Sequence, residues 1–541
     1  MAAKRRKRMR TILRNAKIWL GGDQFASAVL FDSSQILAVG TDAQVEAQRQ
    51  NGDQIIDVQG RLVLPGLCDT HLHCYNKGCT LQNIDLQDVS SIEEIVSRSR
   101  EYIQAHPDSS VIHGRGWNHD YFAEGRILNR ADLDRISTRV PVVLTRACGH
   151  IACVNTCALQ RLGFTGAIVQ PEDGQIDVDE QGCPTGIFRE NAMLLLKPLD
   201  PPLTVTQIKE RLALALAAAA RAGLTTVHSN DVTSENLDLM LEAYRQLRAE
   251  DRMPVRVVLQ CTLTDPESLM RYLEIKEQTP SDEVLVFGPL KLLTDGSLGA
   301  RTAWMRQPYA DDPSTRGIAT MTRAQLDELV SLAHAHGLQC VCHAIGDAAI
   351  EMVLDTFENV NRTSPDNPLR HGIVHCQITD SALIDRFAST HTAALVQPIF
   401  LHYDQHIVEQ RVGTELAQTS YAFRSLAERG VAVSFGTDCP VEDLNPFANL
   451  YCAVTRKDLH HPEASGYRPE EAFSLEAALR CMTETAAWQS FEEGRKGVIQ
   501  IGALPDFTIC DQDVFALAPQ KLKDVRSWMT ICQGKVRWQA E

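Results

Sequence analysis

The strongest constraint on the fold is a repeated alternation of short apolar runs with amphipathic helical patterns. The apolar runs are nearly continuous, as is typical of parallel strands that are buried on both faces. Several of the helical patterns between them end at glycine, a common helix terminator. Eight such units predict a closed (β/α)8 barrel of the TIM type, in the α/β class. The strand-like runs are 62–73, 225–230, 255–262, 287–296, 338–347, 370–377, 393–398 and 431–438.

Both chain ends carry further β-like runs that do not belong to this alternation. The ends therefore predict one small composite β-sandwich domain, made from residues 1–66 and 486–541. The barrel, at 67–485, is inserted in the sequence between these two parts. About 130 residues separate the first two barrel strands, which is too long for a plain loop. This segment, about 75–204, contains strand-like runs of its own. It is predicted to be an insertion that lies over the barrel mouth.

Composition and charge exclude several classes of partner. The 53 basic and 69 acidic residues give a net charge of −16, which argues against nucleic acid as the main partner. The most apolar helical stretch, 212–220, is shorter than the ~20 residues that cross a bilayer. We therefore expect a cytoplasmic protein that acts on a small molecule and not at a membrane. Homodimers are common among such barrels, and the sequence leaves the oligomeric state open.

Two local features have simple interpretations. The basic N-terminus, MAAKRRKRMR, lacks the apolar segment of a secretory signal and is read as a frayed tail; a nuclear address or a phosphate-binding arm is the alternative. Most of the sixteen cysteines lie in apolar runs and are expected to be reduced core residues. Zinc binding by cysteines is the competing interpretation, and its best candidate is the cysteine-rich segment at 148–157. The spacing of that segment fits no common zinc module.

Polar side chains recur where the barrel strands end. His71 and His73 are two residues apart in the first strand and therefore face the same way. Barrel active sites lie at the C-terminal ends of the strands, and ionisable groups there are costly unless something compensates them. Imidazole and carboxylate groups that converge on one rim suit one or two divalent metal ions. The later strands contribute Lys291, His343, His375 and Asp438, with His228 and Asp295 as further candidates.

These positions occur within motifs that resemble the metal-dependent amidohydrolase superfamily, in the branch (amidohydrolase family 3) that includes N-substituted formamide deformylase. The resemblance covers nearly the whole chain, and the motifs keep the same order. The matching stretches are LPGLCDTHLH, GRGWNHD, CGHIACVN, PTGIFRE, KLLTDGSLGART, HAIGDAAIE, RHGIVHCQ, VQP, SFGTDCPVEDLNP and GALPDFTICDQD.

The resemblance implies a role for each ligand candidate. His71, His73 and Asp438 would bind one metal ion, and His343 and His375 would bind a second. Zinc is the expected metal. Lys291 matches a family lysine that reacts with CO₂, and the resulting carbamate would bridge the two ions.

Two positions leave the number of metal ions, one or two, open. Val374 stands where the family often has Glu, and strand alternation predicts that its side chain faces away from the metals. Glu190, in the insertion, is an additional candidate for a ligand or a substrate contact.

The expected activity is hydrolysis of a non-peptide carbon–nitrogen bond, of the amide or N-formyl type. A bound divalent ion would supply hydroxide near neutral pH, and Asp438 would act as general base and then as general acid. Two alternatives stay open. One is the same metal site acting on an ester or lactone or as an isomerase. The other is a non-catalytic scaffold on the same fold, although such relatives are expected to lose metal ligands and all the proposed positions are filled here.

Substrate choice is expected to fall to the insertion and the rim loops. Some candidates have equally good structural interpretations. Trp117 could fill the core of the insertion, Asp295 could pair with Arg301, and Lys291 could form a salt bridge with Asp295. The proposed substrate contacts are Trp117, Asn118, His150, Arg189 and Asp295.

Overall fold

The computed structural model of the chain divides into two compact units. One unit combines Met1–Cys74 with Ala215–Glu541, and the other is Tyr75–Leu214. The described residues are 9–87, 89–119, 122–146, 151–171, 174–200, 202–279, 282–363 and 369–541.

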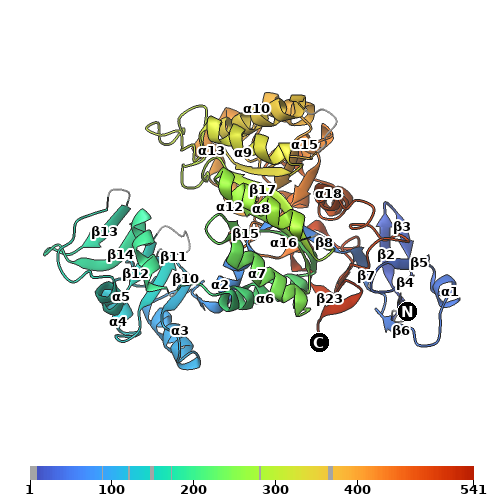
Figure 1. Cartoon of the computed structure of the whole chain (residues 1–541), viewed down its shortest axis with the longest axis horizontal. Coiled ribbons are helices and arrows are strands. Elements are labelled where there is room, and N and C mark those ends of the chain that lie inside the picture. The colour runs from blue at the N-terminus through green and yellow to red at the C-terminus, as the bar shows by residue number, and fades with distance from the viewer. Residues whose placement is uncertain are drawn as a thin grey trace. The chain divides into compact units, whose positions relative to one another are not determined.

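The first unit contains an eight-stranded sheet in which every pair of neighbouring strands is parallel (Figure 1). This sheet confirms the predicted barrel, and each expected strand-like run contributes one strand. In order around the sheet, the strands are β8 (Leu67–Leu72), β15 (Leu224–Thr233), β16 (Arg256–Thr262), β17 (Leu285–Leu293), β18 (Cys340–Ala344), β19 (Gly372–His375), β20 (Ala393–Val396) and β21 (Val433–Phe435).

Helices connect successive barrel strands, as the alternating pattern predicts. Several begin at side-chain caps; Asp265 and Thr322, for example, accept hydrogen bonds from backbone N–H groups of the first turn. The helices are α7 (Leu237–Ala249), α8 (Pro266–Gln278), α9 (Arg323–Ala335), α10 (Asp347–Thr363), α11 (Ser381–Ser389), α12 (Leu401–Asp404), α13 (Val408–Val412), α14 (Thr414–Ala417) and α15 (Phe423–Glu428), with α16 (Pro446–Thr455), α17 (Leu475–Cys481) and α18 (Glu484–Gln489) after the last strand.

Hydrogen bonds join the first and last barrel strands just beyond β8 and β21. The backbone N–H of Asp438 donates to the carbonyl of His71, and the N–H of His73 donates to the carbonyl of Cys439, both over 2.8 Å. The buried Asp69 carboxylate accepts from the backbone N–H and the hydroxyl of Thr437. These contacts hold the two ends of the sheet together at the point where His71, His73 and Asp438 leave it.

The two chain ends form one small β-domain, as predicted. Strand β7 (Leu62–Pro65) pairs antiparallel with β22 (Phe507–Cys510), so both ends share one six-stranded sheet. A four-stranded sheet from the N-terminal part packs on it through a common apolar core that includes Phe31 and Phe507. The other strands are β1 (Thr11–Arg14), β2 (Lys17–Gly21), β3 (Gln24–Ala26), β4 (Ala28–Phe31), β5 (Ile36–Gly40), β6 (Gln54–Asp57), β23 (Ser527–Cys532) and β24 (Lys535–Gln539).

The second unit contains the insertion predicted after the first barrel strand. It is built on a six-stranded mixed sheet with its own apolar core. The predicted fold class is therefore confirmed, while the domain boundaries at residues 66 and 485 stay predictions. The elements are β9 (Ile84–Asp85), α3 (Ile92–Ala105), β10 (Ile112–Trp117), α4 (Arg130–Asp134), β11 (Val142–Arg146), β12 (Ile151–Val154), α5 (Thr156–Arg161), β13 (Gly174–Val178) and β14 (Pro184–Glu190).

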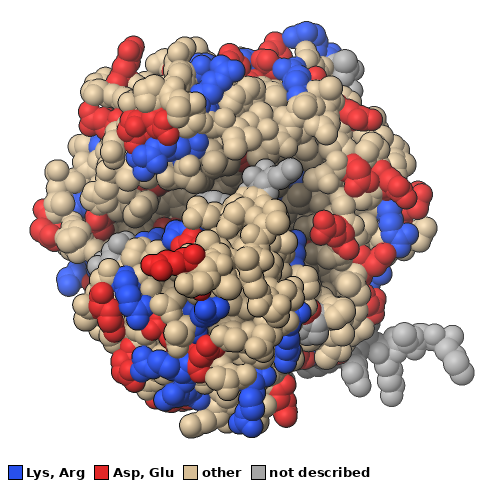
Figure 2. All heavy atoms as spheres, turned by 90° about the vertical axis from the view of Figure 1, so that its left-hand side faces the viewer, with Lys and Arg blue, Asp and Glu red and all other residues tan. Residues whose placement is uncertain are grey.

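Surface charges are mixed in sign. On the face shown in Figure 2, acidic and basic side chains are interspersed. No helix among the described residues is both long and apolar enough to cross a membrane.

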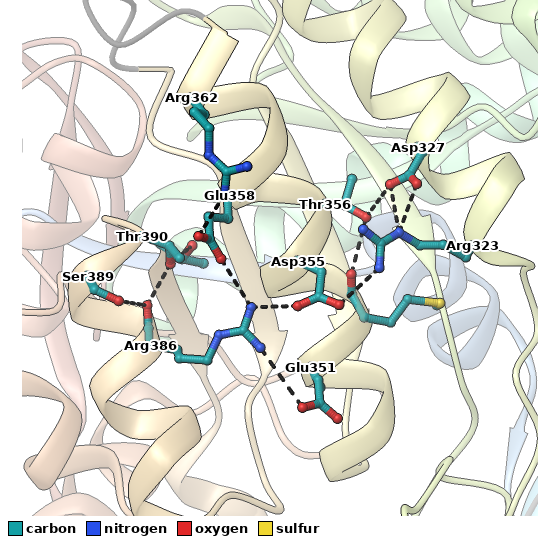
Figure 3. A network of polar contacts seen from close by, with 12 residues as sticks. Arg323, Asp327, Glu351, Asp355, Thr356, Glu358, Arg362, Arg386, Ser389 and Thr390 are labelled. Carbon is teal, nitrogen blue, oxygen red and sulfur yellow. Dashed lines mark hydrogen bonds and ion pairs between the residues drawn. The ribbon is translucent and has the colours of Figure 1, made fainter.

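An ion-pair network links three neighbouring barrel helices (Figure 3). Asp355 of α10 pairs with Arg323 of α9 at 3.0 Å and with Arg386 of α11 at 2.6 Å. Arg323 also pairs with Asp327 in its own helix, and Arg386 also contacts Glu358. Isolated surface pairs contribute little, but this network shares its charges among three helices and fixes their relative positions.

A buried ion pair connects the barrel to the β-domain. Arg256, at the start of β16, donates two hydrogen bonds to Asp506 at 2.6 and 3.1 Å, and both side chains are almost fully buried. Asp506 also accepts from the backbone N–H of Gln533. Removing one member of such a pair leaves an uncompensated buried charge, which is strongly destabilising.

We therefore expect Asp506→Asn to lower the free energy of unfolding by about 3 kcal/mol. Urea denaturation followed by circular dichroism measures this change. Asp251→Asn is the matched control, because Asp251 is half-exposed and pairs with Lys535 at the surface. Asp251→Asn should lower the free energy of unfolding by about 0.5 kcal/mol. Equal losses in the two variants would contradict the structural role given to the buried pair.

Candidate metal centre

His71, His73 and Asp438 meet at the C-terminal end of the barrel. The Nε2 atoms of His71 and His73 lie 3.4 and 3.1 Å from Asp438 Oδ1. One ligand atom from each residue lies within 4.8 Å of the other two, a geometry that can hold a metal ion. The separation of more than 360 residues between His73 and Asp438 is bridged by the hydrogen bonds that join β8 to β21.

Two further imidazoles complete the cluster. The His375 ring lies 4.4 Å from the His343 ring and 5.7 Å from the His71 ring, measured between centroids. His375 ends β19 with a left-handed backbone, φ 82°. The structure thus brings together all four histidines that the sequence predicts as ligands.

Each of these four imidazoles has its Nδ1 held by an oxygen atom. An oxygen acceptor requires Nδ1 to carry the proton, which leaves Nε2 available for a metal ion. The two glutamines in this arrangement are not among the predicted site residues, although each is a polar residue within an apolar strand run. The pairs are His71 with Gln260 (2.6 Å), His73 with the carbonyl of Asn230 (2.8 Å), His343 with Asp295 (2.9 Å) and His375 with Gln397 (2.7 Å).

The electrostatics suit a cation. Burial lowers the pKa of His71 and of His375, which favours the neutral imidazoles that metal ions require. Burial raises the pKa of Asp438, but the neighbouring His73 and His71 outweigh this effect, so its pKa lies below the usual range. Among the described residues, no hydrogen-bond donor satisfies the buried Asp438 Oδ1. This donor set fits a divalent metal ion.

Lys291 projects from β17, and burial lowers its pKa to about 8. The salt bridge to Asp295 considered above does not form, because the Asp295 carboxylate pairs with His343 instead. The register of β17 and β18 pairs Lys291 with Val341, two residues before His343, so Lys291 and His343 face the same side of the sheet.

The position of Asp295 differs from the predicted substrate contact. Its side chain has 0% exposure, and its two oxygens accept from His343 Nδ1 and from the backbone N–H groups of Trp304, Ile345 and Gly346. Arg301 does not pair with it, because Arg301 binds Asp311 through two hydrogen bonds. Asp295 therefore orients a proposed ligand, and its contact with a substrate stays a prediction.

The predicted contacts in the insertion have separate outcomes. Trp117 has 0% exposure and donates from Nε1 to the Leu144 carbonyl, so it fills the core of the insertion, and its contact with a substrate stays a prediction. Asn118 accepts a hydrogen bond from Arg146, and Arg189 forms two hydrogen bonds with Asp177. Asn118 and Arg189 stay predictions as substrate contacts. His150 and the side chain of Glu190 lie outside the described residues.

Val374 does not face away from the site as strand alternation predicts. The register pairs Val374 with His343 on one side and with Leu395 on the other, so these side chains share a face of the sheet. Val374 packs with Val341 and Leu395 in a buried cluster. The simple alternation fails because the left-handed backbone of His375 interrupts the regular strand.

Comparison with known proteins assigns this chain to a family. A model of the amidohydrolase family matches residues 54–537. The chain belongs to the amidohydrolase family. The putative amidohydrolase YtcJ of Bacillus subtilis is 30% identical over 529 residues, which cover 96% of this chain and 98% of that protein. The predicted superfamily is confirmed, and the protein is a metal-dependent hydrolase acting on carbon–nitrogen bonds other than peptide bonds.

Two other relatives cover nearly the whole chain. N-substituted formamide deformylase of Arthrobacter pascens is 25% identical over 536 residues, 95% of each chain. A crystal structure of an uncharacterised metal-dependent hydrolase from Pyrococcus furiosus superposes with a TM-score of 0.77 at 28% identity, covering 95% of this chain and 100% of that one. These similarities extend over both units of the fold.

Gly436, which follows β21, makes the close approach of the two strands possible. A Cβ atom at this position would lie 2.7 Å from the backbone N of His71, 2.9 Å from its O and 3.0 Å from Asp69 Oδ1. Backbone atoms surround most of that space, so the strand carrying His71 would have to move away from Asp438.

We expect Gly436→Ala to lower the free energy of unfolding by about 2 kcal/mol through overpacking. It should also weaken the binding of a divalent metal ion, for which zinc serves as the probe, at least about tenfold, because the ligands separate. Gly299→Ala is the control, since a Cβ there meets its nearest atom at 3.8 Å. Thermal unfolding and zinc titration measure both effects. Wild-type zinc affinity in Gly436→Ala would show that the close contact does not set the ligand geometry.

Proposed function

We propose that this protein hydrolyses the amide or N-formyl bond of a small molecule at a centre of two zinc ions. The convergence of four Nδ1-anchored imidazoles and one carboxylate at the C-terminal end of the barrel supports this proposal. The similarity to N-substituted formamide deformylase supports the N-formyl class of substrate.

Each residue has a proposed place in the centre. His71, His73 and Asp438 would hold one ion, and His343 and His375 would hold the other. Lys291 would hold a carbamate between them. Carbamate formation needs a neutral amine to attack CO₂, and the lowered pKa of Lys291, about 8, increases the neutral fraction at physiological pH.

The chemistry of this centre requires a proton to move from water to the leaving nitrogen. When bound, a divalent ion supplies a water of lowered pKa and polarises a substrate carbonyl. The Asp438 carboxylate would accept the proton of the attacking water and deliver it to the amine as the carbon–nitrogen bond breaks. A bound cation beside Asp438 would favour its ionised form, so Asp438 would begin the cycle as a base.

We expect His71→Ala with His73→Ala to remove hydrolysis of N-formyl and N-acyl amides and to reduce the zinc content of the purified protein. Elemental analysis and a panel of amides against matched esters and lactones measure these properties. His461→Ala is the control, because this histidine is exposed and distant in sequence from every proposed ligand. Unchanged zinc content and turnover in the double variant would refute the metal centre, and preferential cleavage of the esters would replace the proposed substrate class.

For Lys291, the expected result is loss of activity in Lys291→Ala and partial recovery when acetate or formate is added. The small carboxylate can occupy the space of the truncated side chain and take the place of the carbamate. In Lys291→Met the methionine side chain fills that space, so acetate or formate should not restore activity. A carbamate carbon should also appear in the ¹³C spectrum of wild-type protein equilibrated with ¹³C-bicarbonate. Absence of both the recovery and the carbamate signal would rule out a bridging role for Lys291.

A further inference from the structure

The four anchored imidazoles differ in the charge of their partners. His71, His73 and His375 donate from Nδ1 to neutral oxygens, which are two glutamine amides and one backbone carbonyl. His343 donates to the carboxylate of Asp295. A carboxylate behind a ligand imidazole fixes its tautomer and raises its basicity more than a neutral acceptor does.

Asp295 is held rigidly for this task. It has no exposed surface, and it accepts three backbone hydrogen bonds in addition to the one from His343. Two of these donors, Ile345 and Gly346, directly follow β18, and the third, Trp304, lies within the segment between β17 and α9. The carboxylate therefore fixes His343 to both neighbouring loops.

The backbone of His343 is fixed as well. Its carbonyl accepts from the backbone N–H and from the hydroxyl of Thr294, the residue before Asp295. At Gly346, a Cβ atom would lie 2.0 Å from the Trp304 carbonyl, so the two loops pack without space for a side chain. A small shift of the Asp295 carboxylate would thus be transmitted directly to the His343 ring.

We propose that Asp295 is a positioning residue that makes the His343 side of the centre the tighter zinc site. This inference rests on the proposed metal centre. It adds that Asp295 causes the difference in affinity between the two zinc sites. His375, expected to bind the same ion, is oriented by the neutral amide of Gln397, so the charge that distinguishes this site comes from Asp295.

The test is a zinc titration of metal-free protein against a chromophoric chelator, which resolves the affinities of the two ions. Asp295→Asn should raise the dissociation constant of the tighter ion about tenfold and Asp295→Ala about a hundredfold, while that of the weaker ion changes less than twofold. Gln397→Ala should have a smaller effect than Asp295→Ala. Arg301→Ala is the matched control, because it removes a salt bridge in the same loop without touching His343.

The possible outcomes separate the two proposals. If wild-type protein binds two zinc ions and the Asp295 variants bind both equally well, the role of Asp295 is refuted and the hydrolase proposal stands. Equal weakening of both ions, together with a lower unfolding temperature, would show a structural role only and would also refute it. If wild-type protein binds no zinc, the metal centre itself is refuted.

A measurement on unaltered protein covers the case in which both variants fail to fold. In zinc-loaded protein labelled with ¹⁵N-histidine, the Nδ1 proton of His343 should resonate furthest downfield of the four ligand imidazoles, because its acceptor is charged. A resonance no further downfield than that of His375 would overturn the proposal.

Discussion

The close contact between the first and last barrel strands is the constraint on which the site depends. His71 and His73 lie at the end of β8 opposite Asp438, and backbone hydrogen bonds between the two strand ends fix their separation. The absence of a side chain at Gly436 permits the approach, and the buried Asp69 carboxylate reinforces it. The same contacts that close the sheet therefore bring His71, His73 and Asp438 together.

The polar centre is compatible with a buried environment because the Nδ1 atom of every proposed ligand imidazole has a hydrogen-bond acceptor. Burial makes charged imidazoles unfavourable, and an oxygen acceptor at Nδ1 selects the tautomer that presents Nε2 to a cation. Three acceptors come from the adjacent strand or the residues that follow it, and Gln260 comes from β16, the second strand from β8. The barrel therefore supplies both the ligands and the groups that orient them. Asp295 is the charged member of this set.

The insertion shows the limit of assigning function to conspicuous residues. Trp117 lies in a motif shared with the family, but its indole is buried in the core of the insertion and its N–H is satisfied by Leu144. Asp295 was expected at the rim and is instead fully enclosed. In both cases the chemical type of the side chain suggested recognition of a ligand, while its surroundings determine its role.

The sequence by itself determined the barrel, the composite β-domain and the positions of the four histidines, Lys291 and Asp438. These follow from sequence patterns: the alternation of apolar runs with helices, the β-like runs at both chain ends and the polar residues at strand ends. Only the tertiary structure decided which oxygen anchors each imidazole, because Gln260, Gln397 and Asp295 are distant in sequence from their partners or unremarkable in type. It also decided the side of Val374, because strand alternation is a local rule, whereas the left-handed backbone at His375 depends on how the strands close around the site.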